Sequence, residues 1–292
     1  MSIDITITHT DKGFFRKALP FDVLCAQGLS FGSFDGLRLD VGEVGAEDFI
    51  LFHPDHIGRG FSVTWRKGEK NQVSLRLLTP STAEETDDFY DTVERVVGFW
   101  KQSTIEQDGL PITVDQLPEW RTSMKDFSLS TLADFLSRDK DSFLTLFCAM
   151  WPLTLGAEER ALLADATDLS GFRDYLHEKQ SVDAYYAKPR FYSHDDEVMG
   201  SYTLTEDVRS IFPNAPSVPL WMEQEDGQDF EVQSWVVTFY SVSQDRILGV
   251  VSYADFLSEI PGWTYYDGAN SLIEGVSLPV LEAVVAKCGI EI

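Results

Sequence analysis

Residues 61–100 read FSVTWRKGEKNQVSLRLLTPSTAEETDDFYDTVERVVGFW, and their pattern indicates the fold class. Apolar residues alternate with polar ones over residues 61–65 and again over residues 73–77, which is typical of strands with one buried face. The polar run at residues 67–71 supplies a turn between them. The two strands are therefore predicted to form a β-hairpin.

A helix is predicted directly after Pro80. Thr82 and Glu85 have the spacing of a capping box, in which each residue satisfies a backbone N–H of the other. Apolar residues then recur on one helical face. They are Phe89, Val93, Val96, Val97 and Trp100. We expect one helix over residues 82–100 to pack this face on the hairpin.

The second half of the chain repeats this order. Residues 235–240 and 247–251 are apolar and rich in strand-forming side chains, and a short helix is predicted over residues 253–260. Hairpins that are each followed by a packing helix, without βαβ alternation, predict an α+β fold with mostly antiparallel sheets. Other helices are expected at residues 20–27, 158–165, 168–179 and 279–287, and other strands at 3–7, 37–41 and 49–52.

The length of 292 residues suits two domains of ordinary size or one large one. We expect an N-terminal α+β domain over residues 1–140 and a C-terminal α+β domain over residues 141–292. One continuous domain is the alternative.

Charge is the most unusual feature of the composition. The chain has 48 acidic and 23 basic residues, a net charge of −25. Such a surface repels nucleic acid and anionic membranes, so neither is expected as a partner. The charge serves solubility, or it attracts a basic protein partner.

The cysteines and the hydropathy indicate a cytoplasmic protein. Cys25, Cys148 and Cys288 form neither a disulfide framework nor a zinc set, and three free thiols suit a reducing compartment. The first residues lack the features of a signal peptide. The longest uncharged run, residues 142–157, is shorter than the ~20 residues that a membrane-spanning helix needs.

One motif suggests a hydrolase. Gly28-Leu29-Ser30-Phe31-Gly32 matches the G-x-S-x-G nucleophile elbow, which requires a strand before the serine and a helix after it. The sequence before Ser30 favours a helix, and residues 33–36 favour a turn. We therefore interpret the motif as a glycine-rich connection.

Metal ligands are the second kind of candidate. His53, Asp55 and His56 form the only close group with two histidines, although Pro54 favours a surface turn and a distant third ligand such as His194 is needed. Residues 194–197 and 223–229 are rich in carboxylates but fit no EF-hand spacing. No cofactor and no stoichiometric transition metal are predicted.

Aromatic residues near the C-terminus are candidates for partner binding. Trp263, Tyr265 and Tyr266 follow Pro261-Gly262 in a predicted loop. Exposed aromatic side chains anchor protein partners, whereas the same residues packed on the core form a lid.

Several segments resemble a known family. They are Arg59-Gly60-Phe61, the LRLLTPS run at residues 75–81, the QSWVVTFY run at residues 233–240 and the VSYADFL run at residues 251–257. They are similar to a bacterial family of cytoplasmic proteins of about 300 residues that carries only a domain-of-unknown-function label. The resemblance implies a free-standing cytoplasmic protein and supplies no catalytic residue.

The leading hypothesis is a non-enzymatic cytoplasmic protein that acts through a protein partner. The alternatives are an enzyme whose site is assembled from distant residues around His53 and His56, and a small-molecule-binding module. Perturbed acids clustered in one deep pocket favour the enzyme. An exposed apolar patch ringed by acids favours the binding protein. The oligomeric state does not follow from the sequence.

Overall fold

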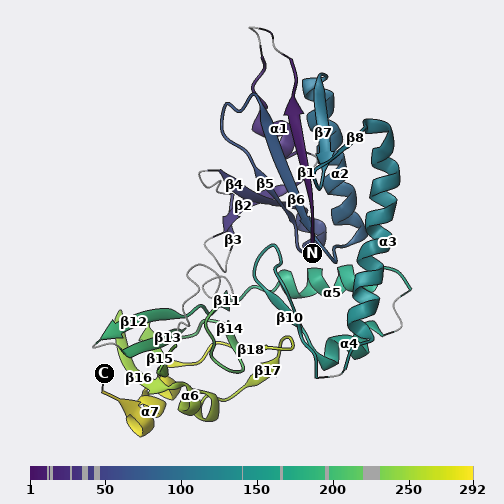
Figure 1. Ribbon diagram of the computed structural model, residues 1–292. Helices are drawn as coiled ribbons and strands as arrows, with labels where there is room; N and C mark the ends of the chain where they lie inside the picture. Colours follow the sequence, from purple (N-terminus) through teal and green to yellow (C-terminus); the bar gives the residue numbers. More distant parts are fainter. Residues whose placement is uncertain are drawn as a thin grey trace. The chain divides into compact units, whose positions relative to one another are not determined.

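The computed structural model describes residues 1–291 except residues 12, 14, 15, 27, 35–38, 43–46, 140, 165, 166, 195, 196 and 220–230 (Figure 1). The chain divides into two compact units. Unit 1 comprises Met1–Leu153 and Ala157–Ser181, and unit 2 comprises Thr154–Gly156 and Val182–Ile292. Antiparallel strand pairs dominate the sheets of both units, and the fold is α+β as expected.

The boundary expected at residue 140 lies inside unit 1, because a later helix is bonded to that unit. The backbone N–H of Ile57 donates to His177 Nδ1 at 3.0 Å, and Arg173 pairs with Glu84 at 2.7 Å. His177 and Arg173 both lie on α5 (Ser170–Gln180).

An eight-stranded antiparallel sheet forms the framework of unit 1, in the order β3-β2-β4-β5-β6-β1-β7-β8. Its strands are β1 (Ser2–His9), β2 (Ser30–Phe34), β3 (Leu39–Val41), β4 (Asp48–Phe52), β5 (Phe61–Thr64), β6 (Gln72–Leu78), β7 (Ser103–Gln107) and β8 (Leu110–Ile112). The predicted hairpin is β5–β6. The turn predicted at residues 33–36 is wrong for Ser33 and Phe34, which continue β2 because they pair with β3. Asp35 and Gly36 lie outside the described residues.

The helices of unit 1 are α1 (Phe21–Leu24), α2 (Ala83–Trp100), α3 (Leu117–Leu136), α4 (Ala157–Leu163) and α5, with the 3-10 turns η1 (Pro54–His56) and η2 (Val114–Gln116). Two short strands, β9 (Leu144–Leu146) and β10 (Leu153–Leu155), lie between α3 and α4 in the sequence.

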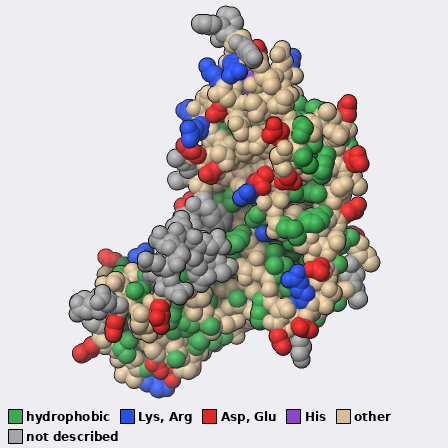
Figure 2. Space-filling model, viewed as in Figure 1, with side chains coloured by type: hydrophobic (Ala, Val, Ile, Leu, Met, Phe, Trp, Pro, Cys, Tyr) green, Lys and Arg blue, Asp and Glu red, His purple; other side chains and the backbone are tan. Residues whose placement is uncertain are grey.

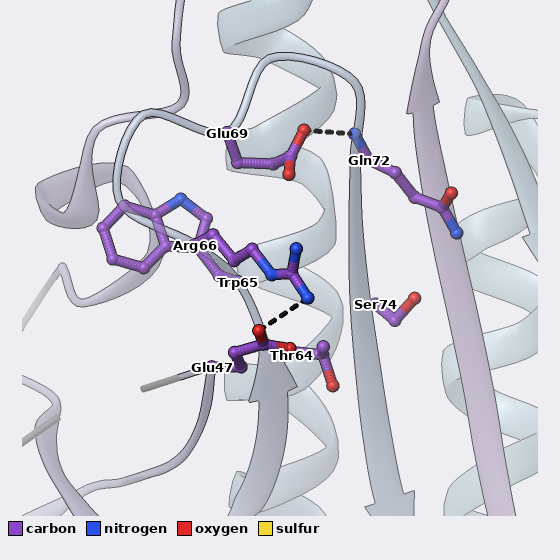
Figure 3. Close-up of a pocket in the computed structure, with 7 residues that line it drawn as sticks. All are labelled: Glu47, Thr64, Trp65, Arg66, Glu69, Gln72 and Ser74. Carbon is purple, nitrogen blue, oxygen red and sulfur yellow. Dashed lines mark hydrogen bonds and ion pairs between the residues drawn. The ribbon is translucent and has the colours of Figure 1, made fainter. Parts of the chain in front are cut away.

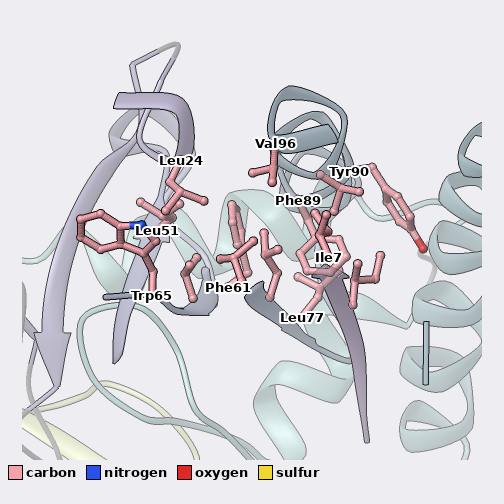
Figure 4. Close-up of a cluster of buried hydrophobic side chains, with 14 of the residues drawn as sticks. Ile7, Leu24, Leu51, Phe61, Trp65, Leu77, Phe89, Tyr90 and Val96 are labelled. Carbon is pink, nitrogen blue, oxygen red and sulfur yellow. The ribbon is translucent and has the colours of Figure 1, made fainter. Parts of the chain in front are cut away.

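The core of unit 1 lies between its sheet and α2. The predicted capping box is present, since Thr82 Oγ1 accepts from the backbone N–H of Glu85 and the Glu85 carboxylate accepts from that of Thr82. Figure 4 shows inward side chains of the strands, including Phe61 and Leu77, facing Phe89 and Val96 of α2. The predicted packing of this helix on the hairpin is confirmed.

The described residues of unit 2 form two sheets. The larger has the order β12-β13-β15-β16-β19, and the smaller has the order β11-β14-β18-β17. The larger is built from β12 (Arg190–His194), β13 (Glu197–Thr205), β15 (Ser234–Ser241), β16 (Arg246–Ser252) and β19 (Gly289–Ile290), with β13 and β15 parallel. The smaller is built from β11 (Tyr185–Tyr186), β14 (Ser210–Pro213), β17 (Trp263–Tyr265) and β18 (Asn270–Ile273).

The helices α6 (Tyr253–Glu259) and α7 (Leu278–Cys288) pack on one face of the larger sheet. A Cβ added at Gly249 of β16 would stand 2.4 Å from Val285 of α7, so the backbone must approach the helix closely there. This face holds the core of unit 2, with Tyr202, Leu204, Val237, Phe239 and Val251. Among the described residues, no helix is both long and apolar enough to cross a bilayer.

Candidate functional site

The histidines predicted as metal ligands lie at η1 of unit 1. The rings of His53 and His56 stack in parallel, with centroids 4.2 Å apart. His53 Nδ1 accepts from the backbone N–H of Asp55 at 3.2 Å, and His56 Nε2 lies 3.1 Å from Asp88 Oδ2. Stacked rings direct their nitrogen lone pairs side by side rather than at one ion.

No third ligand joins this pair in the part of the chain that the structure describes. No group of three or more His, Cys, Asp or Glu side chains there is arranged to hold a metal ion. The side chain of His194, the third ligand suggested by the sequence, is not described. Sequence reasoning missed Asp88, which bonds to His56 of η1, and His177, which accepts from the backbone N–H of Ile57 directly after η1.

The G-x-S-x-G segment does not form a nucleophile elbow. Ser30 is the first residue of β2, and the chain continues from it as a strand, whereas the elbow needs a helix after the serine. Gly28 has a φ of +83° in the connection before it. Of the carboxylate-rich loops, residues 223–229 and both Asp195 and Asp196 lie outside the described residues.

Glu85 is a deeply buried acid of unit 1. Its carboxylate accepts from the backbone N–H of Gly60 at 2.6 Å and from that of Thr82 at 2.9 Å. Burial raises its pKa, and these bonds together with the nearby charge of Arg59 oppose the rise. A Cβ at Gly58 would lie 2.5 Å from the carboxylate, so the loop needs glycine to close around it.

Arg59 belongs to the same cluster. It is 6% exposed, and its guanidinium donates to the backbone oxygens of Phe147 and Pro80, each at 3.0 Å. Two of the segments that carried the family resemblance, RGF and TPS, therefore meet here. Their role is structural, because they join a loop to the N-terminus of α2.

Asp267 is the corresponding acid in unit 2. Its side chain is fully buried, and burial raises its pKa to about 6. Its oxygens accept from the backbone N–H groups of Thr154, Ala269 and Asn270 and from the Asn270 side chain. The carboxylate thus tethers residues 154–156 to the turn before β18.

A surface pocket of about 190 Å³ lies beside the β5–β6 hairpin (Figure 3). Its lining residues are Glu47, Thr64, Trp65, Arg66, Glu69, Gln72 and Ser74. Arg66 pairs with Glu47 at 2.5 Å, and Glu69 accepts from the backbone N–H groups of Lys70, Asn71 and Gln72. Its charged groups thus satisfy one another or the hairpin turn. It contains neither Glu85 nor Asp267.

The aromatic residues predicted as a partner site separate in the structure. Tyr266 is 2% exposed, and Trp263 packs edge-on against Phe212 and Phe256 of the core. The buried indole N–H of Trp263 has no hydrogen-bond partner among the described residues. Tyr265 alone is exposed, at 44%. The three side chains therefore do not form one exposed surface.

A different surface of unit 2 is both open and uncharged. On the face of the larger sheet opposite to α6 and α7, cross-strand partners form two adjacent rows. One row contains Thr203, Thr238, Val250 and Ile290, and the other contains Thr205, Tyr240 and Ile247. We call these seven residues the outer-face patch. All are at least partly exposed, and Ile247 is 60% exposed.

Acids stand at the strand ends beside the outer-face patch. Glu206 follows Thr205 directly, and bonds from Ser241 and Ser243 hold its pKa below the usual range. The Tyr240 hydroxyl bonds to Asp245 in the turn between β15 and β16, and Glu291 follows Ile290. The patch is thus uncharged. Asp245 and Glu291 are exposed carboxylates near its margins, whereas Glu206 is buried, and the exposed Arg190 lies opposite Ser201 on the same face of the sheet.

Unit 2 is strongly acidic as a whole. It contains 18 acidic and 5 basic residues, a net charge of −13. Figure 2 shows acidic side chains scattered over the visible surface rather than gathered at one point. The absence of charge from the outer-face patch therefore contrasts with the rest of this unit.

The comparison with known families agrees with the resemblance found in the sequence. The family described as "Domain of unknown function (DUF4299)" matches residues 2–284. The chain belongs to this family. No curated protein and no solved structure matches the chain.

Proposed function

We propose that this DUF4299 protein is a non-enzymatic cytoplasmic protein of bacteria that binds a basic protein through the outer-face patch of unit 2. The observation that carries the proposal is the two rows of uncharged, partly exposed side chains with carboxylates at their strand ends. Exposed apolar patches with polar margins are typical of protein-interaction sites.

Charge favours one class of partner. A second copy of unit 2 also carries −13, so face-to-face pairing of two copies brings like charges together. Nucleic acid and anionic membranes are repelled for the same reason. The complementary occupant is a protein with an apolar contact area bordered by Lys and Arg.

The buried acids support a binding role over a catalytic one. Glu85 and Asp267 have raised pKa values, but their oxygens are occupied by hydrogen bonds within their own unit. An enzyme would direct such groups into a substrate pocket. The pocket of Figure 3 contains neither group.

The test compares three forms of the full chain in affinity capture from the native host at low salt. They are the wild type, Ile247→Glu in the outer-face patch and Leu110→Glu in β8. Ile247 and Leu110 are exposed to a similar extent, at 60% and 63%, and both variants gain one negative charge. A partner bound at the patch is captured by the wild type and by Leu110→Glu but not by Ile247→Glu.

The captured protein is then purified and titrated against the same three forms. We expect a basic protein and at least a tenfold weaker affinity for Ile247→Glu, about 1.4 kcal/mol. Equal affinity for all three forms, or an acidic partner, contradicts the proposal.

A further inference from the structure

Unit 2 contains a proline segment, residues 213–219, with the sequence PNAPSVP. Its prolines recur every third residue, which is the period of the polyproline II helix. Pro213, Pro216 and Pro219 are each half-buried, as is Val218, whereas Asn214, Ala215 and Ser217 are exposed. The three prolines therefore pack against the rest of the unit.

Two buried tyrosines donate hydrogen bonds to this segment. The Tyr253 hydroxyl donates to the backbone oxygen of Pro213 at 2.6 Å, and the Tyr202 hydroxyl donates to that of Ser217 at 3.4 Å. The two rings pack together, with centroids 5.3 Å apart, and the Trp235 ring lies 5.8 Å from Tyr202. Aromatic surfaces with hydroxyl or indole donors are how proteins bind extended proline-containing segments.

The first end of the segment has stronger hydrogen bonds than the second. At the first end, the backbone N–H of Asn214 donates to Ala269, and the Asn214 side chain accepts from Ser271 at 2.6 Å. Among the described residues, the Tyr202 contact is the only hydrogen bond to residues 215–219, and its 3.4 Å is long for an O–H···O bond. Residues 215–219 are thus the more easily displaced part.

We infer that the Tyr202 hydroxyl, with the adjoining rings of Tyr253 and Trp235, is a binding site for proline-containing extended segments of partner proteins, and that residues 215–219 of the chain occupy it as an internal ligand. A partner peptide offers a backbone oxygen to the Tyr202 hydroxyl in place of that of Ser217, whereas Tyr253 stays bonded to Pro213, which belongs to β14. It must compete with a tethered segment, so the free protein binds it weakly. This site is separate from the outer-face patch and does not depend on it.

The experiment titrates a fluorescent PNAPSVP peptide against the full chain and follows anisotropy. The double variant Pro216→Gly/Pro219→Gly weakens the internal ligand, and we expect it to bind the peptide at least tenfold more tightly than the wild type does. Adding Tyr202→Phe to that variant should lower the affinity severalfold. Adding Tyr192→Phe, at an exposed tyrosine of β12, should leave it unchanged.

The control peptide has alanine in place of the three prolines and should not bind. The inference is overturned if the folded double variant, checked by near-UV circular dichroism, binds PNAPSVP no better than the wild type, or binds both peptides equally. Ile247→Glu should not change peptide affinity, so failure of this site and failure of the outer-face patch remain distinguishable.

A second measurement applies if the double variant does not fold. Limited proteolysis of the wild type within residues 215–219 should accelerate when PNAPSVP is in excess, because the peptide releases the internal ligand. Cleavage at the same rate with both peptides contradicts the inference.

Discussion

Asp267 gives unit 2 a pH dependence whose direction follows from burial. Its pKa is about 6 in the folded protein and about 3.9 in an unfolded chain, so the folded state retains a proton that the unfolded state loses. The resulting stabilisation is fully present below pH 4 and is lost as the pH rises through about 6.

The prediction compares the wild type with Asp267→Asn, which cannot titrate. The free energy of unfolding of the wild type, relative to the variant, should fall by about 2 kcal/mol between pH 4 and pH 7. Urea unfolding at several pH values measures this difference. If the stability of the wild type relative to the variant rises with pH instead, the four N–H donors lower the pKa of Asp267 more than burial raises it.

Glu85 tests whether the family segments around it are structural. Glu85→Ala leaves the buried N–H groups of Gly60 and Thr82 without an acceptor and removes half of the capping box, so we expect a loss of about 3 kcal/mol. Glu84→Ala is the neighbouring control and removes only a partly exposed pair with Arg173, worth at most about 1 kcal/mol. If chemical denaturation shows the same loss of unfolding free energy for Glu85→Ala and Glu84→Ala, the buried hydrogen bonds of Glu85 do not stabilise unit 1.

The three cysteines, all of them in the described part of the chain, form no disulfide. Cys148 is buried, and burial raises the pKa of both Cys25 and Cys288, which lowers the fraction of reactive thiolate. Titration without reductant should count three thiols in denaturant, and all three should react slowly in the native state. An intact mass lower by two hydrogens indicates a disulfide and rejects the prediction.

At the scale of elements, α2 buries more of its residues than any other helix described in unit 1. Trp100 is the last residue of α2. The side chain is 4% exposed, its ring stacks on His9 with centroids 5.2 Å apart, and its indole donates to the backbone oxygen of Lys17.

Trp100→Ala should therefore cost about 3–5 kcal/mol of unfolding free energy. Phe127→Ala on α3, where the ring is already 37% exposed, is the control and should cost less than 1 kcal/mol. A Trp100→Ala variant as stable as the control contradicts the packing described for α2.

The elements that the sequence predicts are those with a strong local pattern. The β5–β6 hairpin and α2 have alternation, a capping box and one apolar face, and these features are all local. By contrast, α3 is not predicted from the sequence, because it has no continuous apolar face and buries only Leu117, Ser128, Leu132 and Phe135 among its 20 residues. Ion pairs instead join it to α2, such as Arg121 with Asp91 at 2.6 Å and Lys125 with Asp87 at 2.7 Å.

Strand order is non-local, and this limits prediction of the candidate site. The outer-face patch exists because β13 pairs in parallel with β15, from which it is separated by about 30 residues of sequence. The alternation within β15 marks its core side, Val237 and Phe239, but gives no indication that Thr238 and Tyr240 stand beside Thr203 and Thr205. The sequence predicts a partner site at Trp263, Tyr265 and Tyr266 because they follow Pro261-Gly262, but of these three side chains only Tyr265 is exposed.

At the scale of the whole molecule, charge and contact surface have different roles in the proposed binding. The net charge of −25 creates a negative potential that attracts a basic partner, and salt shortens its reach to ~8 Å at physiological ionic strength. The uncharged outer-face patch provides the short-range contacts. Charge should therefore control the association rate, and the patch should control the dissociation rate.

The most direct test measures both rate constants for the captured partner by stopped flow, at about 20 mM and about 500 mM salt. The association rate of the wild type should fall at least tenfold between these conditions. Ile247→Ala, which leaves the charge unchanged, should raise the dissociation rate and keep the same salt dependence. An association rate that salt does not change, together with a dissociation rate unaffected by Ile247→Ala, contradicts binding of a basic partner at the outer-face patch.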